Sequence, residues 1–242
     1  MLASLQEKFM PDEWHPRDGF AEYIRILPQT HPPMDRKKGV LAVISGFSGV
    51  GKGTAVKELL KKFPYALSVS ATTRNPRPGE VPGVSYHYIT KEEFEKRIEE
   101  NDFFEWACYV DNYYGTPKSF VMERLEAGQD VILEIEAEGA FKVRSQYPEA
   151  LLLFMVPPSM EELRRRLVGR GTETEETVAK RLKKASDEEL DKAKLYDFLV
   201  INDDLEACVE ELHSVIQNCS GIRPTETDLL ERLAAEAKEL KL

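Results

Sequence analysis

A glycine-rich loop that follows an apolar run is the segment of this chain best suited to bind an anion. The run Val40–Ile44 leads into GFSGVGKGT, residues 46 to 54. Glycines let backbone N–H groups turn inward without a Cβ atom in the way, and the next helix directs its positive end to the same point. Lys52 can then reach the outer phosphates of a nucleotide, so the spacing predicts a nucleoside triphosphate site. The residues expected there are Gly46, Ser48, Gly49, Val50, Gly51, Lys52, Gly53 and Thr54.

The end of this loop departs from the strict phosphate-loop pattern. That pattern has Ser or Thr directly after the lysine, where the hydroxyl binds magnesium. Gly53 holds this position here, and Thr54 comes one residue later. A strand-to-helix turn that merely needs glycine is the alternative, but the glycines and the lysine at these intervals favour a nucleotide site.

A second group of side chains suited to phosphate lies in the turn-rich segment 68–88, SVSATTRNPRPGEVPGVSYHY. Arg74 and Arg77 offer planar guanidinium groups that match phosphate oxygens. The hydroxyls of Ser70 and Tyr86 can complete such a shell. Segments of this composition also form solvated polar loops, and the segment by itself leaves both interpretations open.

Three carboxylates are also placed where they could do chemistry. Glu105 lies in the aromatic run FFEW, where burial would require hydrogen-bond donors around it. Glu134 and Glu136 end the apolar run that begins at Val131. Parallel sheets bind ligands beyond the carboxyl ends of their strands, so these two carboxylates are expected at the same edge as the phosphate loop.

The elements that must position these groups alternate along the chain from Val40 onward. Apolar runs predict buried strands, and caps and helical periodicity predict helices between them. The expected strands are 40–45, 67–70, 131–136, 151–156 and 198–201. The expected helices are 50–62, 90–101 (opened by a capping box at Thr90), 116–128, 159–169, 174–194 and 203–216. This alternation indicates an α/β fold with a parallel sheet covered by helices on both faces.

Two terminal segments stand apart from this alternation. Residues 1–38 are rich in proline, show little periodicity and end in three basic residues, so we interpret them as an extension of unknown role. Within residues 218–242, the part from Thr225 onward places apolar side chains on one helical face. This amphipathic helix is expected to dock on the domain or on a second copy of the chain.

Composition limits the classes of function. The 242 residues are enough for one large domain, and a net charge of -10 disfavours binding to nucleic acid through its phosphates. Three widely spaced cysteines and four scattered histidines indicate neither disulfides nor a metal cluster, and fit a reducing cytoplasm. No apolar run reaches about 18 residues, so no membrane span is expected. The oligomeric state stays open.

Four segments, SATTRNPRPGE, EWACYVDNYYGTP, LEIEAEGA and PPSMEELRRRLVGRGTETEE, resemble the guanylate kinase family in order and spacing. The similarity covers about residues 39–217. It implies a P-loop kinase core with a five-stranded parallel sheet, an inserted GMP-binding region at about 71–127 and a mobile lid at about 166–182. The activity implied is transfer of the γ-phosphoryl group of ATP to GMP, and to dGMP, with Mg²⁺.

The resemblance also assigns residues. Those matching the family's GMP-phosphate site are Ser70, Arg74, Arg77, Tyr86 and Tyr114, and those matching its guanine site are Glu105, Thr116 and Glu136. The matching lid arginines are Arg166, Arg170 and Arg181, which with Lys52 and Arg74 would be catalytic, whereas Arg164 and Arg165 are expected to face solvent. Asn202 is expected either near the adenine of ATP or, like Asp203, as a helix N-cap.

The chain departs from the family pattern at a few positions. Phe47 replaces a usual proline, Glu136 stands for a common Asp, and Glu138 stands for a common Gln and adds a negative charge. The Gly53-Thr54 ending is shared by related monophosphate kinases, so Mg²⁺ is expected to be held largely by phosphates and waters, with Thr54 as a helper. The alternatives are a non-catalytic guanylate-kinase-like binding module, which the intact Lys52 loop disfavours, and a sugar-phosphate kinase of the same fold.

Overall fold

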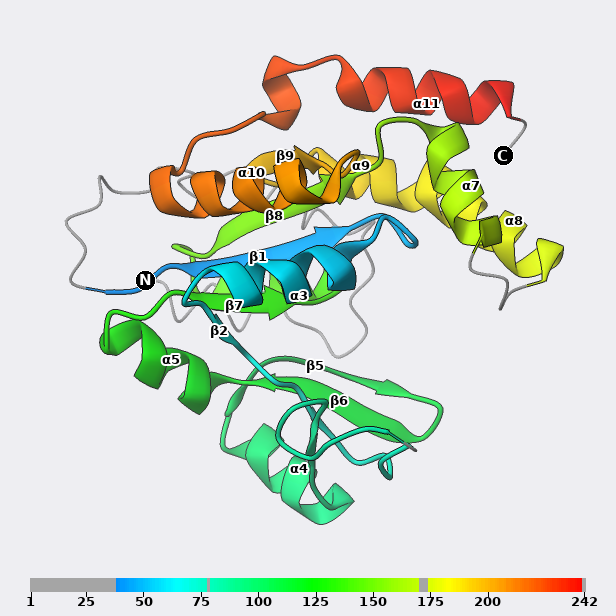
Figure 1. The fold of residues 1–242 in the computed structure, drawn as a ribbon. Helices are drawn as coiled ribbons and strands as arrows, with labels where there is room; N and C mark the ends of the chain where they lie inside the picture. Colours follow the sequence, from blue (N-terminus) through cyan, green and yellow to red (C-terminus); the bar gives the residue numbers. More distant parts are fainter. Residues whose placement is uncertain (1–37, 78, 170–173, 241–242) are drawn as a thin grey trace.

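Five parallel strands form the main sheet, in the order β2-β7-β1-β8-β9. The computed structural model describes residues 38–77, 79–169 and 174–240, and Figure 1 shows this sheet in the middle of the molecule. The strands are β1 (Leu41–Gly46), β2 (Ala66–Leu67), β7 (Val131–Glu134), β8 (Leu151–Val156) and β9 (Phe198–Ile201). The predicted five-stranded parallel sheet is therefore confirmed.

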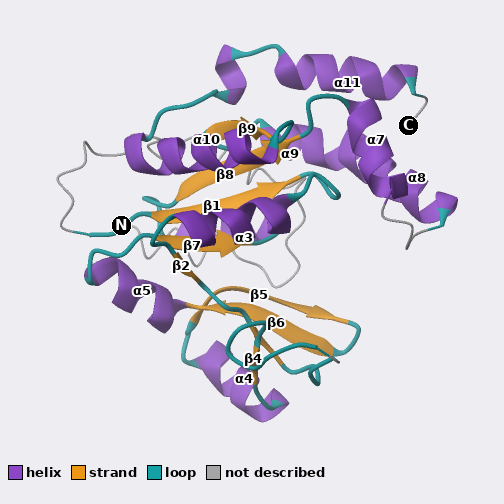
Figure 2. Cartoon of the chain, viewed as in Figure 1, coloured by secondary structure: helices purple, strands orange, loops and turns teal. Residues whose placement is uncertain are grey.

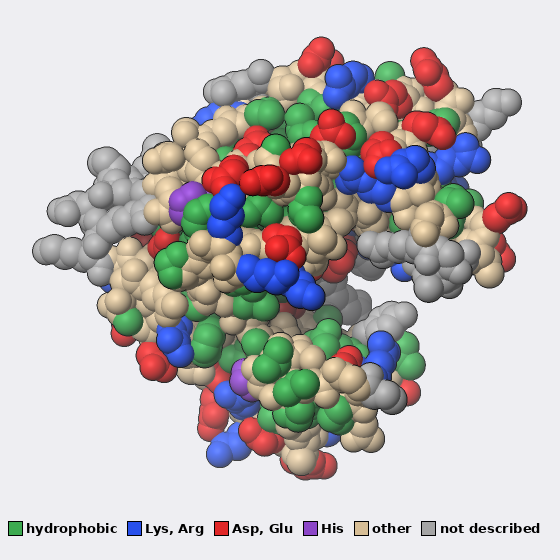
Figure 3. Space-filling view, viewed as in Figure 1, with side chains coloured by type: hydrophobic (Ala, Val, Ile, Leu, Met, Phe, Trp, Pro, Cys, Tyr) green, Lys and Arg blue, Asp and Glu red, His purple; other side chains and the backbone are tan. Residues whose placement is uncertain are grey.

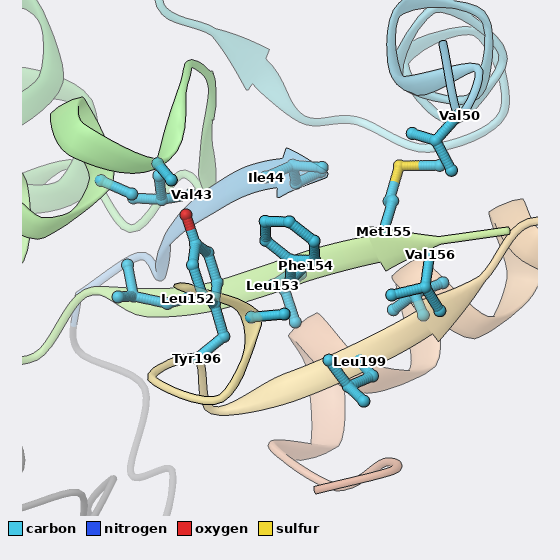
Figure 4. Close-up of a cluster of buried hydrophobic side chains, with 14 of the residues drawn as sticks. Val43, Ile44, Val50, Leu152, Leu153, Phe154, Met155, Val156, Tyr196 and Leu199 are labelled. Atoms are coloured by element: carbon cyan, nitrogen blue, oxygen red, sulfur yellow. The ribbon is translucent and has the colours of Figure 1, made fainter. Parts of the chain in front are cut away.

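The central strands are apolar along their whole length because elements cover both faces of the sheet. Every residue of β1 and β8 is buried, and Figure 4 shows their side chains packed with Tyr196 and Leu199. Phe47 belongs to this core: it is 2% exposed, and its ring meets that of Phe154 edge-on with 5.4 Å between centroids. This aromatic residue therefore anchors the phosphate loop to β8.

Helices alternate along the chain with the strands of the main sheet (Figure 2). They are α3 (Lys52–Lys62), α5 (Lys118–Glu126), α6 (Ala137–Gln146), α7 (Met160–Gly169) and α10 (Leu205–Asn218). The N-cap of α10 is Asp204, whose side chain accepts a hydrogen bond from the Ala207 N–H at 2.9 Å. The expectation that Asn202 or Asp203 caps this helix is wrong, because the backbone turns one residue later.

The predicted helix 174–194 is present, but a π-helical turn lies within it. It is divided into α8 (Glu175–Lys184), a π-helical turn (Ala185–Glu189) and α9 (Leu190–Ala193). A π-helical turn inserts an extra residue and so shifts the face that later side chains present, an effect that helical periodicity in the sequence does not reveal.

A second sheet was not predicted from the sequence. Its order is β4-β3-β6-β5, with β4 (His87–Tyr88), β3 (Ala71–Thr72), β6 (Asn112–Pro117) and β5 (Phe103–Tyr109), and helix α4 (Lys91–Glu99) packs on it. Thr90 caps α4 by accepting from the Glu93 N–H, as the capping box predicts. Thr116 belongs to β6 instead of opening α5, and the expected strand 67–70 ends at Leu67.

The last helix, α11 (Leu229–Glu239), follows a 3₁₀ turn (Pro224–Glu226) and packs on the domain itself. Its Leu230 and Leu233 are buried, and Glu236 accepts a hydrogen bond from the Met160 N–H at 2.8 Å. Figure 1 shows α11 beside α7, which confirms docking within the chain. Across the described ranges, no helix combines the length and apolar character needed to cross a membrane. The N-terminal extension lies outside these ranges.

Candidate active site

The phosphate loop joins β1 to α3 at the carboxyl edge of the main sheet. Gly51 has φ of 98° and serves as the N-cap of α3, a conformation that favours glycine. Lys52 Nζ donates to the Ile135 carbonyl at 3.3 Å and lies 3.8 Å from a Glu136 carboxylate oxygen. The lysine is therefore held at the end of β7, pointing to the edge where ligands of parallel sheets bind.

Two side chains, Asn202 at the end of β9 and Arg166 on α7, support the loop at Val50. Asn202 Nδ2 donates to the Val50 carbonyl at 2.8 Å, and Arg166 Nη1 donates to the same carbonyl at 3.2 Å and to the Asn202 carbonyl at 2.8 Å. A Cβ atom at Gly51 would lie 2.7 Å from Asn202 Nδ2. Asn202 thus supports the loop. Its side chain also leaves no room for a Cβ atom at position 51, which is a second reason for glycine there.

A carboxylate lies close to Gly53, where the strict pattern has Ser or Thr. A Cβ atom at this position would lie 3.3 Å from Glu134 Oε1. The carboxylate of Glu134 thus stands beside the position where the strict pattern has Ser or Thr. Partial burial raises the pKa of Glu134 above its ordinary value, and nearby Lys52 opposes this effect.

Arg74 lies at the centre of a polar cluster on the second sheet. Its two terminal nitrogens donate to the two carboxylate oxygens of Glu80, each at 2.9 Å, and its guanidinium lies 5.4 Å from the centre of the Tyr86 ring. Tyr86 in turn meets Tyr114 edge-on at 6.0 Å between ring centroids. The structure therefore brings together three of the side chains assigned to the GMP phosphate.

Glu80 was not predicted as a site residue. Besides Arg74, it accepts hydrogen bonds from the Arg77 N–H at 2.7 Å and the Tyr88 hydroxyl at 2.8 Å. The bonds from Arg74, followed by that from Arg77, lower the pKa of Glu80 to about 2. The signal available in the sequence was a single carboxylate that follows Arg74 and Arg77 and precedes Tyr86.

Glu105 and Thr116 face each other across the β5–β6 pair. The Thr116 hydroxyl, on a residue that is 1% exposed, donates to Glu105 Oε1 at 2.7 Å. Burial raises the pKa of Glu105, and the bond from Thr116 opposes this effect. The donor that the aromatic surroundings of Glu105 were expected to require is therefore present.

Helix α6 connects the two halves of the site. A Cβ atom at Gly139 would lie 3.4 Å from the Glu105 carboxyl carbon, so this carboxyl packs on the first turn of α6. Glu136, which directly precedes α6, lies beside Lys52 with 68% of its side chain exposed. Figure 3 shows the molecule hollowed between the main-sheet half and the half built on the second sheet.

The proposed lid arginines lie in different surroundings. Arg181 Nη1 donates to the Ser48 hydroxyl at 3.2 Å, and Arg166 is bound to Glu162 as well as to the loop. Arg170 lies outside the described residues. Arg164 and Arg165 have 54% and 73% of their side chains exposed, as expected.

Glu138 is paired with Lys192, so its additional charge is compensated. Over the described part of the chain, no three acidic, histidine or cysteine side chains gather as a metal site.

Comparison with known proteins identifies the family. The family model for guanylate kinase matches residues 38–219. A guanylate kinase of Caldanaerobacter subterraneus subsp. tengcongensis is 52% identical over 182 residues, which are 75% of this chain and 88% of that protein. A guanylate kinase of Clostridium tetani is 49% identical over 198 residues, 81% and 95% of the two chains.

A solved structure agrees with these relatives. The crystal structure of guanylate kinase from Anaplasma phagocytophilum superposes with a TM-score of 0.55 at 28% identity, and the match covers 75% of this chain and 86% of that one. The residues that the family model matches include both the phosphate loop and the second sheet with its Arg74 and Glu105 clusters. The chain therefore belongs to the guanylate kinase family.

Proposed function

We propose that this chain is an ATP:GMP phosphotransferase, which converts ATP and GMP into ADP and GDP and also accepts dGMP. The observation that carries this assignment is the Glu105–Thr116 pair on the second sheet, whose carboxyl packs on the same helix that begins beside Lys52. A buried carboxylate paired with a hydroxyl is suited to read a base, and the lysine loop is suited to hold a triphosphate.

Guanine is recognised through an exchange of hydrogen bonds. Guanine offers N1–H and an amino group as donors and O6 as an acceptor. In the protein, the single hydroxyl hydrogen of Thr116 is donated to Glu105. When guanine donates to the Glu105 carboxylate, this hydroxyl becomes free to donate to O6, and Glu136 can accept from the amino group. Adenine lacks N1–H and has a donor in place of O6, so it would leave these polar groups unpaired.

The GMP phosphate binds to the cluster around Arg74, with Ser70, Arg77, Tyr86 and Tyr114. Support comes from the contact of Arg74 with Tyr86 and from the bidentate bond that Glu80 makes with Arg74. Glu80 holds the guanidinium in one orientation, and a further N–H of Arg74 donates to the Asn75 carbonyl at 2.7 Å. The phosphate would be bound by the N–H groups that these acceptors leave. Arg77, whose side chain is exposed, can turn toward the same oxygens.

Phosphoryl transfer needs positioned positive charge more than covalent chemistry. Lys52 and the loop amides hold the ATP phosphates, and Arg166, Arg170 and Arg181 stabilise the charge on the transferring group. The GMP phosphate oxygen that attacks is already ionised at neutral pH, so no general base is required. The bonds of Arg166 to the Val50 and Asn202 carbonyls place it at the side of the loop where Asn202 is assigned to ATP.

Magnesium is the cofactor that this reaction implies, since a bound Mg²⁺ would supply positive charge against that of the phosphates. The residues beside the loop fit such an ion. Glu134 places a carboxylate oxygen 3.3 Å from the Cβ position of Gly53, and oxygen ligands of this kind suit Mg²⁺. Glu134 and Thr54 would hold the ion together with the phosphates and waters.

The division of the chain is part of the same proposal. Residues 39–217 form the kinase domain, with a GMP-binding region at about 71–127 and a lid at about 166–182, whereas 1–38 and 218–242 are added segments. The substrates are small molecules, and nucleic acid and membranes are not partners. We assign the protein to the cytoplasm, which the free thiols of Cys108 and Cys208 support.

A coupled assay of ADP release tests the assignment, with GMP, dGMP, AMP, UMP and ribose 5-phosphate offered as acceptors in turn. We expect turnover with GMP and dGMP far above that with the others. Equal turnover with AMP would refute guanine recognition. Preference for the sugar phosphate would favour a sugar-phosphate kinase, and absence of turnover together with retained GMP binding would favour a binding module.

A further inference from the structure

Ser48, in the middle of the phosphate loop, is held by two side chains from a single distant segment. Its backbone N–H donates to Glu189 Oε2 at 3.1 Å, and its hydroxyl accepts from Arg181 Nη1 at 3.2 Å. Arg181 lies on α8, and Glu189 ends the π-helical turn that continues α8. One helical segment therefore contacts both the main chain and the side chain of the same loop residue.

A carboxylate is an unexpected neighbour for a loop that binds phosphates, because its negative charge opposes theirs. Positive charge near Glu189 reduces this opposition: Lys184 Nζ lies 3.9 Å from Glu189 Oε1 and 3.8 Å from a Glu136 oxygen. Burial raises the pKa of Glu189, and the hydrogen bond from Ser48 opposes this effect. The bond from the Ser48 N–H thus favours the ionised form of the carboxylate.

Two roles are conceivable for this bond. Glu189 could compete with a phosphate for the Ser48 N–H, or it could hold the loop in its binding shape. A competitor would have to withdraw when the nucleotide binds. Glu189 is only 4% exposed, and Leu190, next in the chain, and Ala185, about one turn earlier, are also buried. A buried carboxylate that leaves its donors costs several kcal/mol, so the bond is expected to persist in the nucleotide complex.

We propose that Glu189 is a positioning residue for the donor nucleotide, which fixes the Ser48 amide and, together with Arg181, ties helix α8 to the phosphate loop. This inference rests on the proposed function, since it concerns how the ATP side of that site is kept in shape. The π-helical turn supports it, because such turns occur frequently at functional sites and this one ends at the contacting residue.

The test compares three variants by calorimetric binding of Mg·ADP and of GMP, each without turnover. Glu189→Met keeps the volume of the side chain but removes the acceptor, and should weaken ADP binding at least tenfold, roughly the effect of losing one hydrogen bond to a charged group. Glu189→Gln keeps an acceptor oxygen and should bind ADP within about threefold of the wild type. Glu188→Ala, in the same turn but exposed, should bind as the wild type.

GMP binding should be unchanged in all three variants, and in turnover assays KM for ATP should rise in Glu189→Met while KM for GMP stays constant. Equal or tighter ADP binding by Glu189→Met would overturn the proposal, as would equal weakening of ADP and GMP binding. If Glu189→Met does not fold, Glu189→Asp, which withdraws the carboxylate by one methylene, must weaken ADP binding selectively. A wild-type protein that binds ADP but does not phosphorylate GMP would refute the proposed function without affecting this comparison.

Discussion

Replacing Glu105 by Gln tests guanine recognition at its centre. The Thr116 hydroxyl donates to Glu105 Oε1 at 2.7 Å, so in the variant this hydroxyl would select the amide oxygen and turn the NH₂ group toward guanine. The NH₂ donor of the glutamine would then face the N1–H donor of guanine. A lost hydrogen bond to a charged group costs about 1.5–3 kcal/mol, and a buried donor left unpaired costs about 1–3 kcal/mol.

Together these costs come to about 2.5–6 kcal/mol, which lowers kcat/KM for GMP about 60- to 20 000-fold at about 1.4 kcal/mol per tenfold. The coupled assay of ADP release measures this change, with GMP varied at saturating ATP and ATP varied at saturating GMP. KM for ATP should stay within about twofold, because Glu105 lies on the second sheet and contacts no loop residue that binds ATP. Glu99→Gln, an exposed change on α4, is the matched control and should behave as the wild type.

The reasoning fails if Glu105→Gln reduces kcat/KM for GMP less than about fivefold, or if it weakens ATP and GMP use equally. In the first case Glu105 does not accept from guanine. In the second case the substitution disturbs the whole site, and the result gives no support to the proposed hydrogen-bond exchange between Glu105, Thr116 and guanine.

Three further predictions follow from the same geometry. Lys52→Ala should lower kcat about 100- to 1000-fold by removing a phosphate donor, while calorimetry shows unchanged GMP binding. Burial raises the pKa of Glu105 above that of an ordinary carboxyl group, and only the ionised form accepts hydrogen bonds from guanine. KM for GMP should therefore rise as the pH falls through this raised pKa. The pH profile of Glu105→Gln should lack this rise but keep the dependence that comes from the GMP phosphate. The turn Val110-Asp111 has φ of 47° and 61°, so Val110→Asn with Asp111→Gly should add about 1 kcal/mol to the free energy of unfolding in urea.

Much of the main-sheet half could be predicted because its signals are local. The strand, the glycines and Lys52 are consecutive, and each later strand is a short apolar run that needs no knowledge of its neighbours. The second sheet was missed for the opposite reason. Its β3 and β4 have two residues each, too few to show alternation, and Phe103–Tyr109 carries polar and apolar residues without a clear period.

The sequence by itself predicted a nucleotide site at the Lys52 loop, and its resemblance to guanylate kinases indicated which side chains are expected to meet GMP. Only the tertiary structure decided what holds those groups. Asn202 braces Val50 instead of capping a helix, Glu134 takes the space beside Gly53, and Glu80 and Glu189 fix Arg74 and Ser48. Contacts such as that between Ser48 and Glu189 join residues 141 positions apart, and no local pattern of residue types records which distant carboxylate the fold will bring to a given amide.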